Sequence, residues 1–161
     1  MAVLQDRGRT ALARAIAAQS IFLAWGRGVA AWDGAPEPEP TTAAGLVDEI
    51  GRRMVTSVQF VQPDADGPIE LPDGSRYANS AQPTKWLHVQ WTFDFADAAG
   101  EHIRELAIFV GGTVVAGLPP GQRYFTRAQV DNPGDLYSLE RVPVFTRNPG
   151  VRQVQEYVLP F

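Results

Sequence analysis

The sequence contains no cysteine and only two histidines, His88 and His102, among its 161 residues. Without cysteine the chain can form no disulfide, no thiolate nucleophile and no cysteine-ligated metal site. Two histidines are too few for a three-histidine zinc site. We therefore expect stability to come from packing or from neighbouring subunits, and we expect neither a metal nor another cofactor.

Positive charge is also scarce, with 14 Lys and Arg against 18 Asp and Glu and a formal net charge of −4. A phosphate-binding surface needs clustered Lys and Arg, so we expect no nucleic-acid partner. No apolar run approaches the roughly 20 residues of a membrane-spanning helix. Asp6, Arg7 and Arg9 interrupt the N-terminus, which therefore lacks the apolar core of an export signal. We expect a soluble protein without membrane insertion, made in the cytoplasm.

Apolar residues make up 45% of the chain and aromatic residues 10%, which are proportions of a folded globular protein. The length suits one domain with a real core, so we predict a single domain over residues 1–161. Within it we expect an N-terminal helix over 1–20, an extended loop rich in Pro and Glu over 33–42, and a β-rich body over 54–161. The predicted fold class is mainly β (α+β), an antiparallel sheet or sandwich with two short helices and long loops.

The most informative stretch is Leu87–Phe95, where apolar and polar residues alternate strictly. Such alternation predicts a strand packed on one side only. The apolar face carries Leu87, Val89, Trp91, Phe93 and Phe95, and the polar face carries His88, Gln90, Thr92 and Asp94. After turn-forming residues at 96–100, the apolar run Ile103–Val110 predicts the second strand of a β-hairpin. We expect the aromatic residues to be buried against this run and the polar face to be solvated.

Two short helices are predicted. The first has Leu4, Leu12 and Ile16 at roughly helical spacing among alanines, which favour helix. This helix either packs over one end of the sheet or docks on a partner subunit, and packing on its own core is the commoner role. The second is expected to begin at Thr41 or Thr42 and to run through Ile50.

Further strands are predicted at Ile21–Trp25, Met54–Val61, Thr113–Ala116, Leu136–Phe145 and Val151–Leu159. Pro143 interrupts the strand at Leu136–Phe145. Because proline donates no hydrogen bond to a sheet, we expect that strand to lie at a sheet edge.

Few residues suggest chemistry. His88 and His102 would approach each other across the predicted hairpin, with Asp94, Asp97 or Glu101 as possible companions, but these residues are also what a solvated outer face contains. Glu101 and Glu105 share one face of a strand, as paired carboxylates would, yet Arg104 adjoins Glu105 and no cleft can be inferred. No serine lies in a G-x-S-x-G pattern. We expect no catalytic residue.

Residues 64–67, Asp-Ala-Asp-Gly, are similar to the first part of a calcium-binding loop. The motif also requires a closing glutamate, and Ser75 occupies that position. We therefore interpret this segment as a plain turn.

Several segments resemble, in the expected order, structural proteins of phage tails from the baseplate and tail-fibre-collar region. They are DRGRTALARAIAAQ, IFLAWGRG, GLVDEIGRR, FDFADAAG with IRELAIFVGG, and the ending VRQVQEYVLPF. The resemblance implies a non-enzymatic structural subunit of a phage tail that joins baseplate, tail-tube or tail-fibre components by protein–protein contacts. It also implies a virion location and partners among other tail proteins and copies of the same chain in a symmetric ring.

Partner contacts are predicted at two places. Residues 35–40, APEPEP, can form neither a sheet nor a helix interior. Ordering such an arm costs about 1–2 kcal/mol per residue, so we expect it to lie on another surface. An aromatic residue directly after the last strand is either tucked into the fold or inserted into a partner. The predicted partner-binding residues are Trp32, Pro36, Pro38, Pro40, Tyr157 and Phe161.

The four tryptophans support an alternative function, a carbohydrate-binding β-sandwich that recognises the host surface. Trp25 and Trp91 are expected in the core. Trp32 and Trp86 are candidates for exposure, where they would stack on sugar rings, or for burial at a subunit interface, where tryptophan is a frequent anchor.

Overall fold

The computed structural model describes residues 1–161 and is mainly β, with antiparallel strand pairs, one α-helix and two 3-10 turns. Helix α1 spans Asp6–Ala17, η1 spans Ala30–Asp33 and η2 spans Arg127–Gln129. The predicted fold class is confirmed, although only one of the two expected helices is present. No helix has the length and apolar character that crossing a bilayer requires.

The chain divides into two compact units, each built around one five-stranded sheet. The first unit comprises Met1–Gln19, Thr56–Trp91 and Gln155–Phe161, and the second comprises Ser20–Val55 and Thr92–Val154. The single domain over residues 1–161 stays a prediction.

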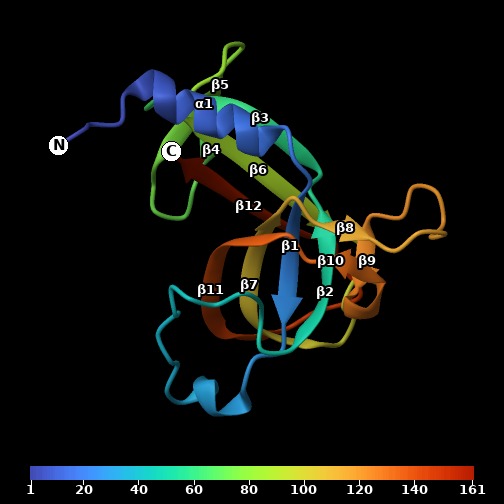
Figure 1. Ribbon diagram of the computed structural model, residues 1–161. Coiled ribbons are helices and arrows are strands. Elements are labelled where there is room, and N and C mark those ends of the chain that lie inside the picture. The colour runs from blue at the N-terminus through green and yellow to red at the C-terminus, as the bar shows by residue number, and fades with distance from the viewer. The chain divides into compact units, whose positions relative to one another are not determined.

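The sheet of the second unit has the strand order β11-β7-β1-β2-β9, which can be followed in Figure 1. Its strands are β1 (Ile21–Gly26), β2 (Glu49–Met54), β7 (His102–Val110), β9 (Tyr124–Thr126) and β11 (Asp135–Thr146). Two shorter strands, β8 (Thr113–Val114) and β10 (Val130–Asn132), pair beside it. All its strand pairs are antiparallel, and the register places Phe22 of β1 opposite Phe109 of β7 on one side and Met54 of β2 on the other.

Strand β1 is the centre of this sheet and is buried along its whole length. Because successive side chains point to opposite faces, it contributes to packing on both sides. On one face, a cluster of buried residues consists of Phe22, Ala24, Ala107, Phe109, Phe125 and Val130. On the other face, Trp25 stacks on Phe93 with ring centroids 3.6 Å apart and meets Phe145 edge-on at 6.1 Å. This two-sided core explains why IFLAWG lacks polar residues.

The sheet of the first unit has the order β12-β6-β3-β5-β4. Its strands are β3 (Ser57–Pro63), β4 (Ile69–Glu70), β5 (Arg76–Asn79), β6 (Trp86–Phe93) and β12 (Gln153–Pro160). Leu87, Val89 and Trp91 of β6 are fully buried, and Trp91 meets Tyr157 edge-on at 6.2 Å. The predicted alternation on this strand is therefore confirmed for its apolar face as far as Phe93.

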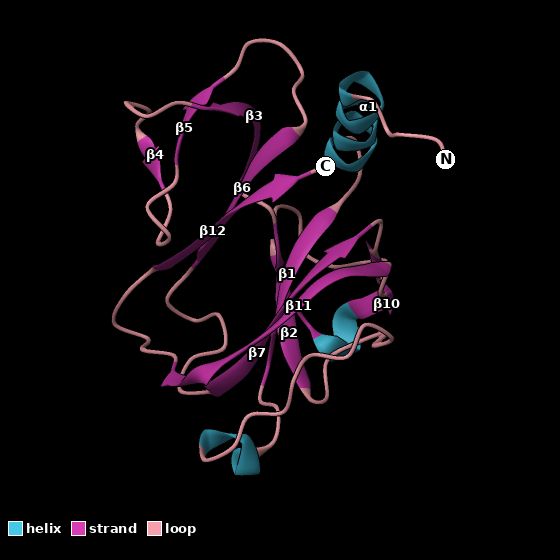
Figure 2. Ribbon diagram, turned by 90° about the vertical axis from the view of Figure 1, so that its left-hand side faces the viewer, coloured by secondary structure: helices cyan, strands magenta, loops and turns pink.

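Helix α1 lies beside the sheet of the first unit (Figure 2). Ala13 is the only buried residue in the helix, while Leu12 and the preceding Leu4 are exposed. An ion pair of 2.8 Å joins Asp6 to Lys85. The helix thus buries little of its apolar surface against the first unit, and docking on a partner remains a prediction for it.

The predicted central hairpin is wrong. Strand β6 lies between β12 and β3, whereas β7 lies between β1 and β11. Strands that follow each other in sequence do not have to pair, and here the residues after Phe93 carry the chain from one sheet to the other. The apolar run of β7 is buried as expected, with Ile103, Leu106 and Ile108 in the core.

The predicted second helix is also wrong, because residues 41–48 form no helix and Glu49–Met54 is strand β2. Gly51 explains part of this outcome. A Cβ at Gly51 would lie 2.6 Å from the carbonyl oxygen of Phe125 on the adjacent strand β9. Close approach of two backbones is a usual reason for glycine in a strand. Tertiary pairing therefore overrides the local helical preference.

The edge position predicted for the Pro143 strand is confirmed, since β11 is the outermost strand on one side of its sheet. Its register with β7 shifts between Arg141 and Phe145, and Pro143 falls within this irregular stretch. Residues 64–67 form the expected turn, in which the amide of Asp66 donates to the Asp64 carboxylate at 2.9 Å.

Candidate partner-binding surfaces

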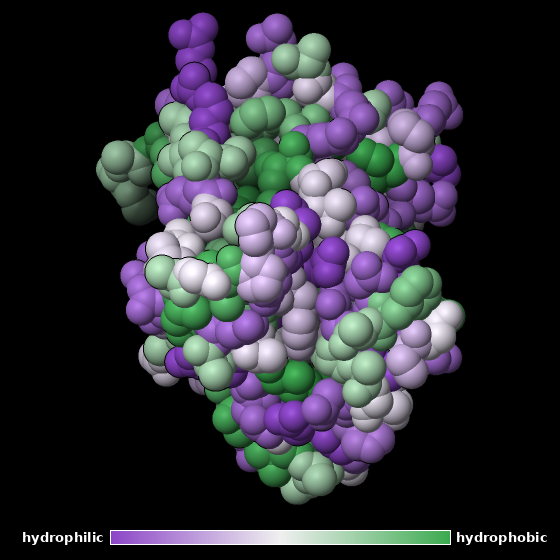
Figure 3. Space-filling model, turned by 90° about the vertical axis from the view of Figure 1, so that its right-hand side faces the viewer, coloured by the Kyte–Doolittle hydropathy of each residue, from purple (hydrophilic) through white to green (hydrophobic).

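Exposed large apolar side chains are distributed over the chain and include Leu12, Phe95, Tyr137 and Val154. Figure 3 shows one face of the molecule, on which hydrophobic and hydrophilic residues are interspersed. Candidate surfaces are therefore distinguished by how firmly their exposed residues are held, because a preorganised segment loses less entropy on binding.

The first candidate is the long connection between β1 and β2, residues 27–48, which we name the strap. Its prolines Pro36, Pro38 and Pro40 are all exposed, as a partner-binding segment requires. Trp32, in contrast, is only 8% exposed and lies under the guanidinium of Arg141, 4.0 Å from the ring centroid. Trp32 therefore fixes the strap to its own chain.

Arg141 of β11 also holds the Pro-Glu part of the strap. Its backbone amide donates to the Glu39 carboxylate at 2.9 Å, and its guanidinium donates to the carbonyls of Glu37 and Pro38 at 3.0 and 3.1 Å. Strand β11 of the same chain therefore already holds this arm, and its contact with a partner stays a prediction. The glutamate side chains find a partner in the edge strand.

Further ion pairs fix the rest of the strap to β7 and to the residue before it. Arg27 donates two hydrogen bonds of 2.7 Å to Glu101, and Arg104 donates two, of 2.7 and 2.9 Å, to Asp33. The buried Glu105 accepts a hydrogen bond of 2.9 Å from the amide of Val47. Glu101 and Glu105, considered above as a carboxylate pair, are therefore both occupied in holding the strap.

These contacts lower the pKa values of the carboxyl groups that make them. The side-chain hydrogen bond from Arg104 lowers the pKa of Asp33, and the one from Arg27 lowers the pKa of Glu101. The backbone hydrogen bond from Arg141 lowers the pKa of Glu39.

We expect Asp33 to titrate below about 3.9 and Glu39 and Glu101 below about 4.3, the ordinary values. Because the folded pKa values are the lower ones, these contacts stabilise the fold above the ordinary values, and their contribution is lost as the pH falls through the folded values. Carbon-13 NMR titration of the carboxyl groups measures this directly. Arg104→Gln should return Asp33 toward its ordinary value, whereas Arg14→Gln on α1 should not. An Asp33 midpoint at or above the ordinary value would contradict the proposed anchoring.

A groove runs beside the strap, between Glu39–Ala43 and β11, with a volume of about 380 Å³. Leu136 and Leu139 are half-buried in its wall, and Tyr137 is exposed. Pro40, one of the exposed prolines, thus borders a partly apolar hollow of the same unit.

The second candidate is the end of β12, where Tyr157 and Phe161 are half-buried. The amide of Phe161 donates to the carbonyl of Lys85 at 2.9 Å, which fixes the last residues to the first unit. The predicted residues thus fall into two groups, with Trp32 and the prolines in the second unit and Tyr157 and Phe161 in the first.

The third candidate, the turn Asp94–Asp97 after β6, was missed by the sequence analysis. Phe95, predicted to be buried, is 44% exposed. The strand ends at Phe93, and the amide of Asp97 donates to the carbonyl of Asp94 at 3.1 Å, so the alternation of faces stops there. The exposed ring is therefore a feature of a turn and not of a strand face.

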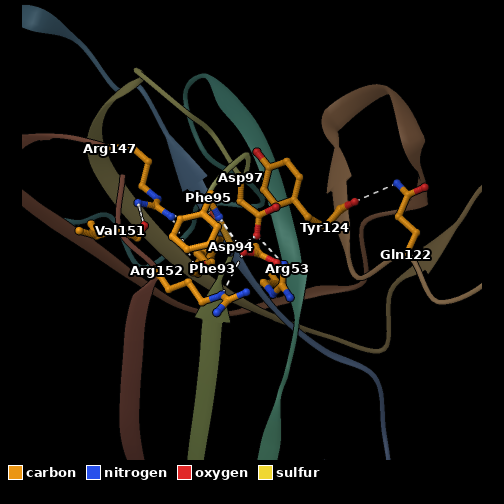
Figure 4. A network of polar contacts seen from close by, with 10 residues as sticks. All are labelled: Arg53, Phe93, Asp94, Phe95, Asp97, Gln122, Tyr124, Arg147, Val151 and Arg152. Atoms are coloured by element: carbon orange, nitrogen blue, oxygen red, sulfur yellow. Dashed lines mark hydrogen bonds and ion pairs between the residues drawn. The ribbon is translucent and has the colours of Figure 1, made fainter. Parts of the chain in front are cut away.

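Two arginines brace this turn (Figure 4). Asp97, which is buried, accepts from the guanidinium of Arg53 at 2.5 Å and from the amide of Asp94 at 2.7 Å. The fully buried Arg147 donates to the carbonyl of Asp94 at 2.7 Å. The turn is thereby fixed from two directions within the second unit.

Arg152 holds the Phe95 ring from one side. Its guanidinium lies 4.7 Å from the ring centroid and pairs with the Asp94 carboxylate at 3.1 Å. The hydrogen bond from the Phe95 amide, followed by the one from Arg152, lowers the pKa of Asp94.

A pocket of about 410 Å³ adjoins this turn. It is lined by Arg53, by residues of the turn and by the segment Gly121–Tyr124. Burial raises the pKa of the Tyr124 hydroxyl, so this group stays neutral at the wall of the pocket. The pocket thus combines fixed charges with an exposed aromatic ring next to it.

The two histidines do not form a site. His88, expected to be solvated, is buried, and its Nε2 lies 2.9 Å from the Glu156 carboxylate on β12. His102 is exposed, and its Nδ1 lies 2.9 Å from the Thr146 hydroxyl in the second unit. No group of three or more His, Asp or Glu side chains is placed to hold a metal ion.

The tryptophans offer no exposed platform of the kind that sugar rings stack on. Trp25 and Trp91 are in the core as predicted, and Trp32 is buried. Trp86 is half-buried, with the ammonium of Lys85 lying 4.8 Å from its ring centroid.

A mainly β chain that presents braced, exposed segments has the character of a structural protein that binds other proteins. A family model described as "Baseplate wedge 3 tail fiber network component" matches residues 1–161, and the chain belongs to this family. It is a structural component of the phage-tail baseplate and a protein of the virion tail, so the resemblance to phage-tail proteins is confirmed. None of the curated proteins matches the chain.

Proposed function

We propose that this chain joins tail-fibre components to the baseplate through contacts made by the strap and by the end of β12. The observation that carries the proposal is the state of the Pro-Glu segment. Its backbone is fixed by Arg141, yet Pro36, Pro38 and Pro40 point into solvent. Proline-rich segments bind with a small entropy cost because their extended conformation is preformed.

The end of β12 supports a second contact of the same kind. Strand β12 is the outermost strand of its sheet, and an outer strand offers backbone groups to an added strand from another chain. Tyr157 and Phe161 are only half-buried there and supply side chains for such a contact. Trp32 acts differently in this proposal, as a positioning residue that holds Arg141 and with it the strap.

The partners in this proposal are other baseplate and tail-fibre proteins, together with copies of the same chain in a symmetric ring. Neither nucleic acid nor a membrane is among them, and assembly takes place in the host cytoplasm. The acidic net charge supports the first exclusion, since a phosphate-binding surface requires clustered positive charge.

Replacing Pro36, Pro38 and Pro40 together by alanine should leave a soluble, folded protein whose incorporation into baseplates falls by at least about tenfold, which corresponds to about 1.4 kcal/mol of contact energy. The measurement is quantitative mass spectrometry of particles from a gene-deleted phage complemented with each variant. Pro72→Ala, at an exposed proline of the first unit, is the matched control. A thermal melt of each isolated variant separates lost binding from lost folding. Wild-type incorporation of the triple variant would contradict the role of the strap.

A further inference from the structure

We propose that Phe95 and the adjoining pocket form a separate binding surface that takes an acidic, extended segment of another baseplate protein. The surface is formed by Phe95, Arg53, Arg123, Arg152, Asp94 and Asp97. It includes neither the strap nor the end of β12, so it goes beyond the function proposed above. In the bound state an apolar side chain of the segment lies on the Phe95 ring, and a neighbouring carboxylate pairs with Arg123.

The first argument is that the exposed ring stands on a turn whose backbone is held by hydrogen bonds. Phe95 sits in a turn whose two aspartates are each bound by an arginine, Asp97 by Arg53 and Asp94 by Arg152. The carbonyl of Asp94 is held in addition by the buried Arg147. Aromatic residues and arginine are the residue types often found as anchors of protein interfaces. An anchor on a braced turn loses little entropy when a partner covers it.

The second argument is the local charge. The surface carries three guanidinium groups and two carboxylates, and both carboxylates are already paired. The third, Arg123, is exposed, donates to the carbonyl of Val55 and makes no ion pair. In a protein of net charge −4 this is a local excess of positive charge. Charge complementarity therefore selects a partner that brings a carboxylate, which the planar guanidinium of Arg123 can bind with two hydrogen bonds.

The third argument is the shape of the pocket. A volume of about 410 Å³ is enough for a few side chains of an extended segment and not for a folded element. Its walls come from the turn, from β2 and from the segment Gly121–Tyr124, which includes Arg123. Phe95 follows the lining residue Asp94, so a segment bound in the pocket passes beside the turn that carries the ring.

The observations favour protein over a glycan. A sugar ring stacks on an open aromatic face, and one side of Phe95 is covered by Arg152. The guanidinium of Arg123, which makes no ion pair, binds a carboxylate best, and neutral sugars carry no carboxylate.

The test is photo-crosslinking in assembled baseplates. p-Benzoylphenylalanine is introduced in place of Phe95, which keeps an aromatic side chain at an exposed position, and the crosslinked peptides are identified by mass spectrometry. We expect a crosslink to a different baseplate protein, within a few residues of Asp or Glu. Arg123→Glu should lower the crosslink yield by at least about tenfold. Arg7→Glu, at an exposed arginine on α1, should not lower it.

Three results would overturn the proposal: no crosslink, a crosslink to a second copy of this chain, or a yield that Arg123→Glu leaves unchanged. Binding of purified host-surface polysaccharide to the isolated protein that shifts the NMR signals of Phe95, without a protein crosslink, would replace it by glycan recognition. Recovery of the Arg123→Glu yield when the crosslinked carboxylate is changed to arginine would confirm the ion pair. The strap variants are scored by incorporation and these variants by crosslinking at position 95, so failure of one proposal is distinct from failure of the other.

Discussion

Phe93→Ala should lower the free energy of unfolding by about 3–5 kcal/mol, the usual cost of removing a large aromatic side chain from a core. Phe93 is fully buried and stacks on Trp25 at a centroid distance of 3.6 Å. Phe95→Ala, two residues later, should cost less than about 1 kcal/mol, because it removes only an exposed ring and its contact with Arg152.

Urea denaturation of the two variants in parallel makes this comparison, with the slope against denaturant checked for constancy. Each variant serves as the control for the other, since both remove the same atoms from the same segment. Equal losses of stability at the two positions would show that Phe95 is packed in the isolated subunit, and the turn after β6 would then be assigned wrongly.

Arg147→Ala should also lower the free energy of unfolding by about 3–5 kcal/mol, because a fully buried side chain is removed and several partly buried carbonyl groups lose their donors. The Arg147 side chain donates to the carbonyls of Asn148, Val151 and Asp94 at 2.5, 2.7 and 2.7 Å. It has no carboxylate partner, so its role is to tie two backbone segments of the second unit together, the turn at residues 148–151 and the turn after β6.

Arg152→Ala is the matched control, since Arg152 pairs with the same residue, Asp94, but its side chain is 59% exposed. Such a surface pair contributes about 0–1 kcal/mol. Arg147→Lys should fall between the two, because the charge stays while the fork of donors is lost. Thermal or urea unfolding gives all three values. An Arg147→Ala variant as stable as Arg152→Ala would rule out the buried guanidinium as a structural tie.

The sequence predicts those features of this fold that depend on local pattern. The alternation correctly predicted that Leu87, Val89, Trp91 and Phe93 are in the core. Pro143 correctly predicted that its strand lies at a sheet edge. Both inferences rest on the geometry of a single strand, namely its two faces and its hydrogen-bond donors. They therefore do not depend on which other strand is the neighbour.

The errors concern features that depend on distant residues. The pairing of β7 with β1 instead of β6 is decided by the long run of apolar contacts along Ile21–Gly26, which no local pattern reveals. The helix predicted over residues 41–50 is absent for a similar reason, since Gly51 and Arg52 pair with β9 as part of strand β2. The burial of His88 depends on Glu156, which lies 68 residues away in sequence.

The Phe95 surface was missed because the alternation was extended two residues past the end of its strand. A local signal was present: Asp94 and Asp97 flank the segment, and aspartate favours turns by accepting hydrogen bonds from nearby backbone amides. Two bonds are of that kind: the Phe95 amide donates to the Asp94 carboxylate at 2.9 Å, and the Asp94 amide donates to the Asp97 carboxylate at 2.7 Å. The bracing arginines, in contrast, come from other parts of the chain and follow from no local pattern.

Hydroxyl-radical footprinting of intact baseplates against the isolated subunit tests the proposed joining role most directly, because it reports the exposure of individual side chains. We predict that oxidation of Pro36, Pro38 and Pro40, and of Tyr157 and Phe161, falls markedly in the baseplate. Oxidation of the exposed Pro72, outside both proposed contacts, should stay as it is in the isolated protein. Equal oxidation of the strap prolines in the two states would contradict the account, since it would show that the strap touches no other protein in the assembled tail.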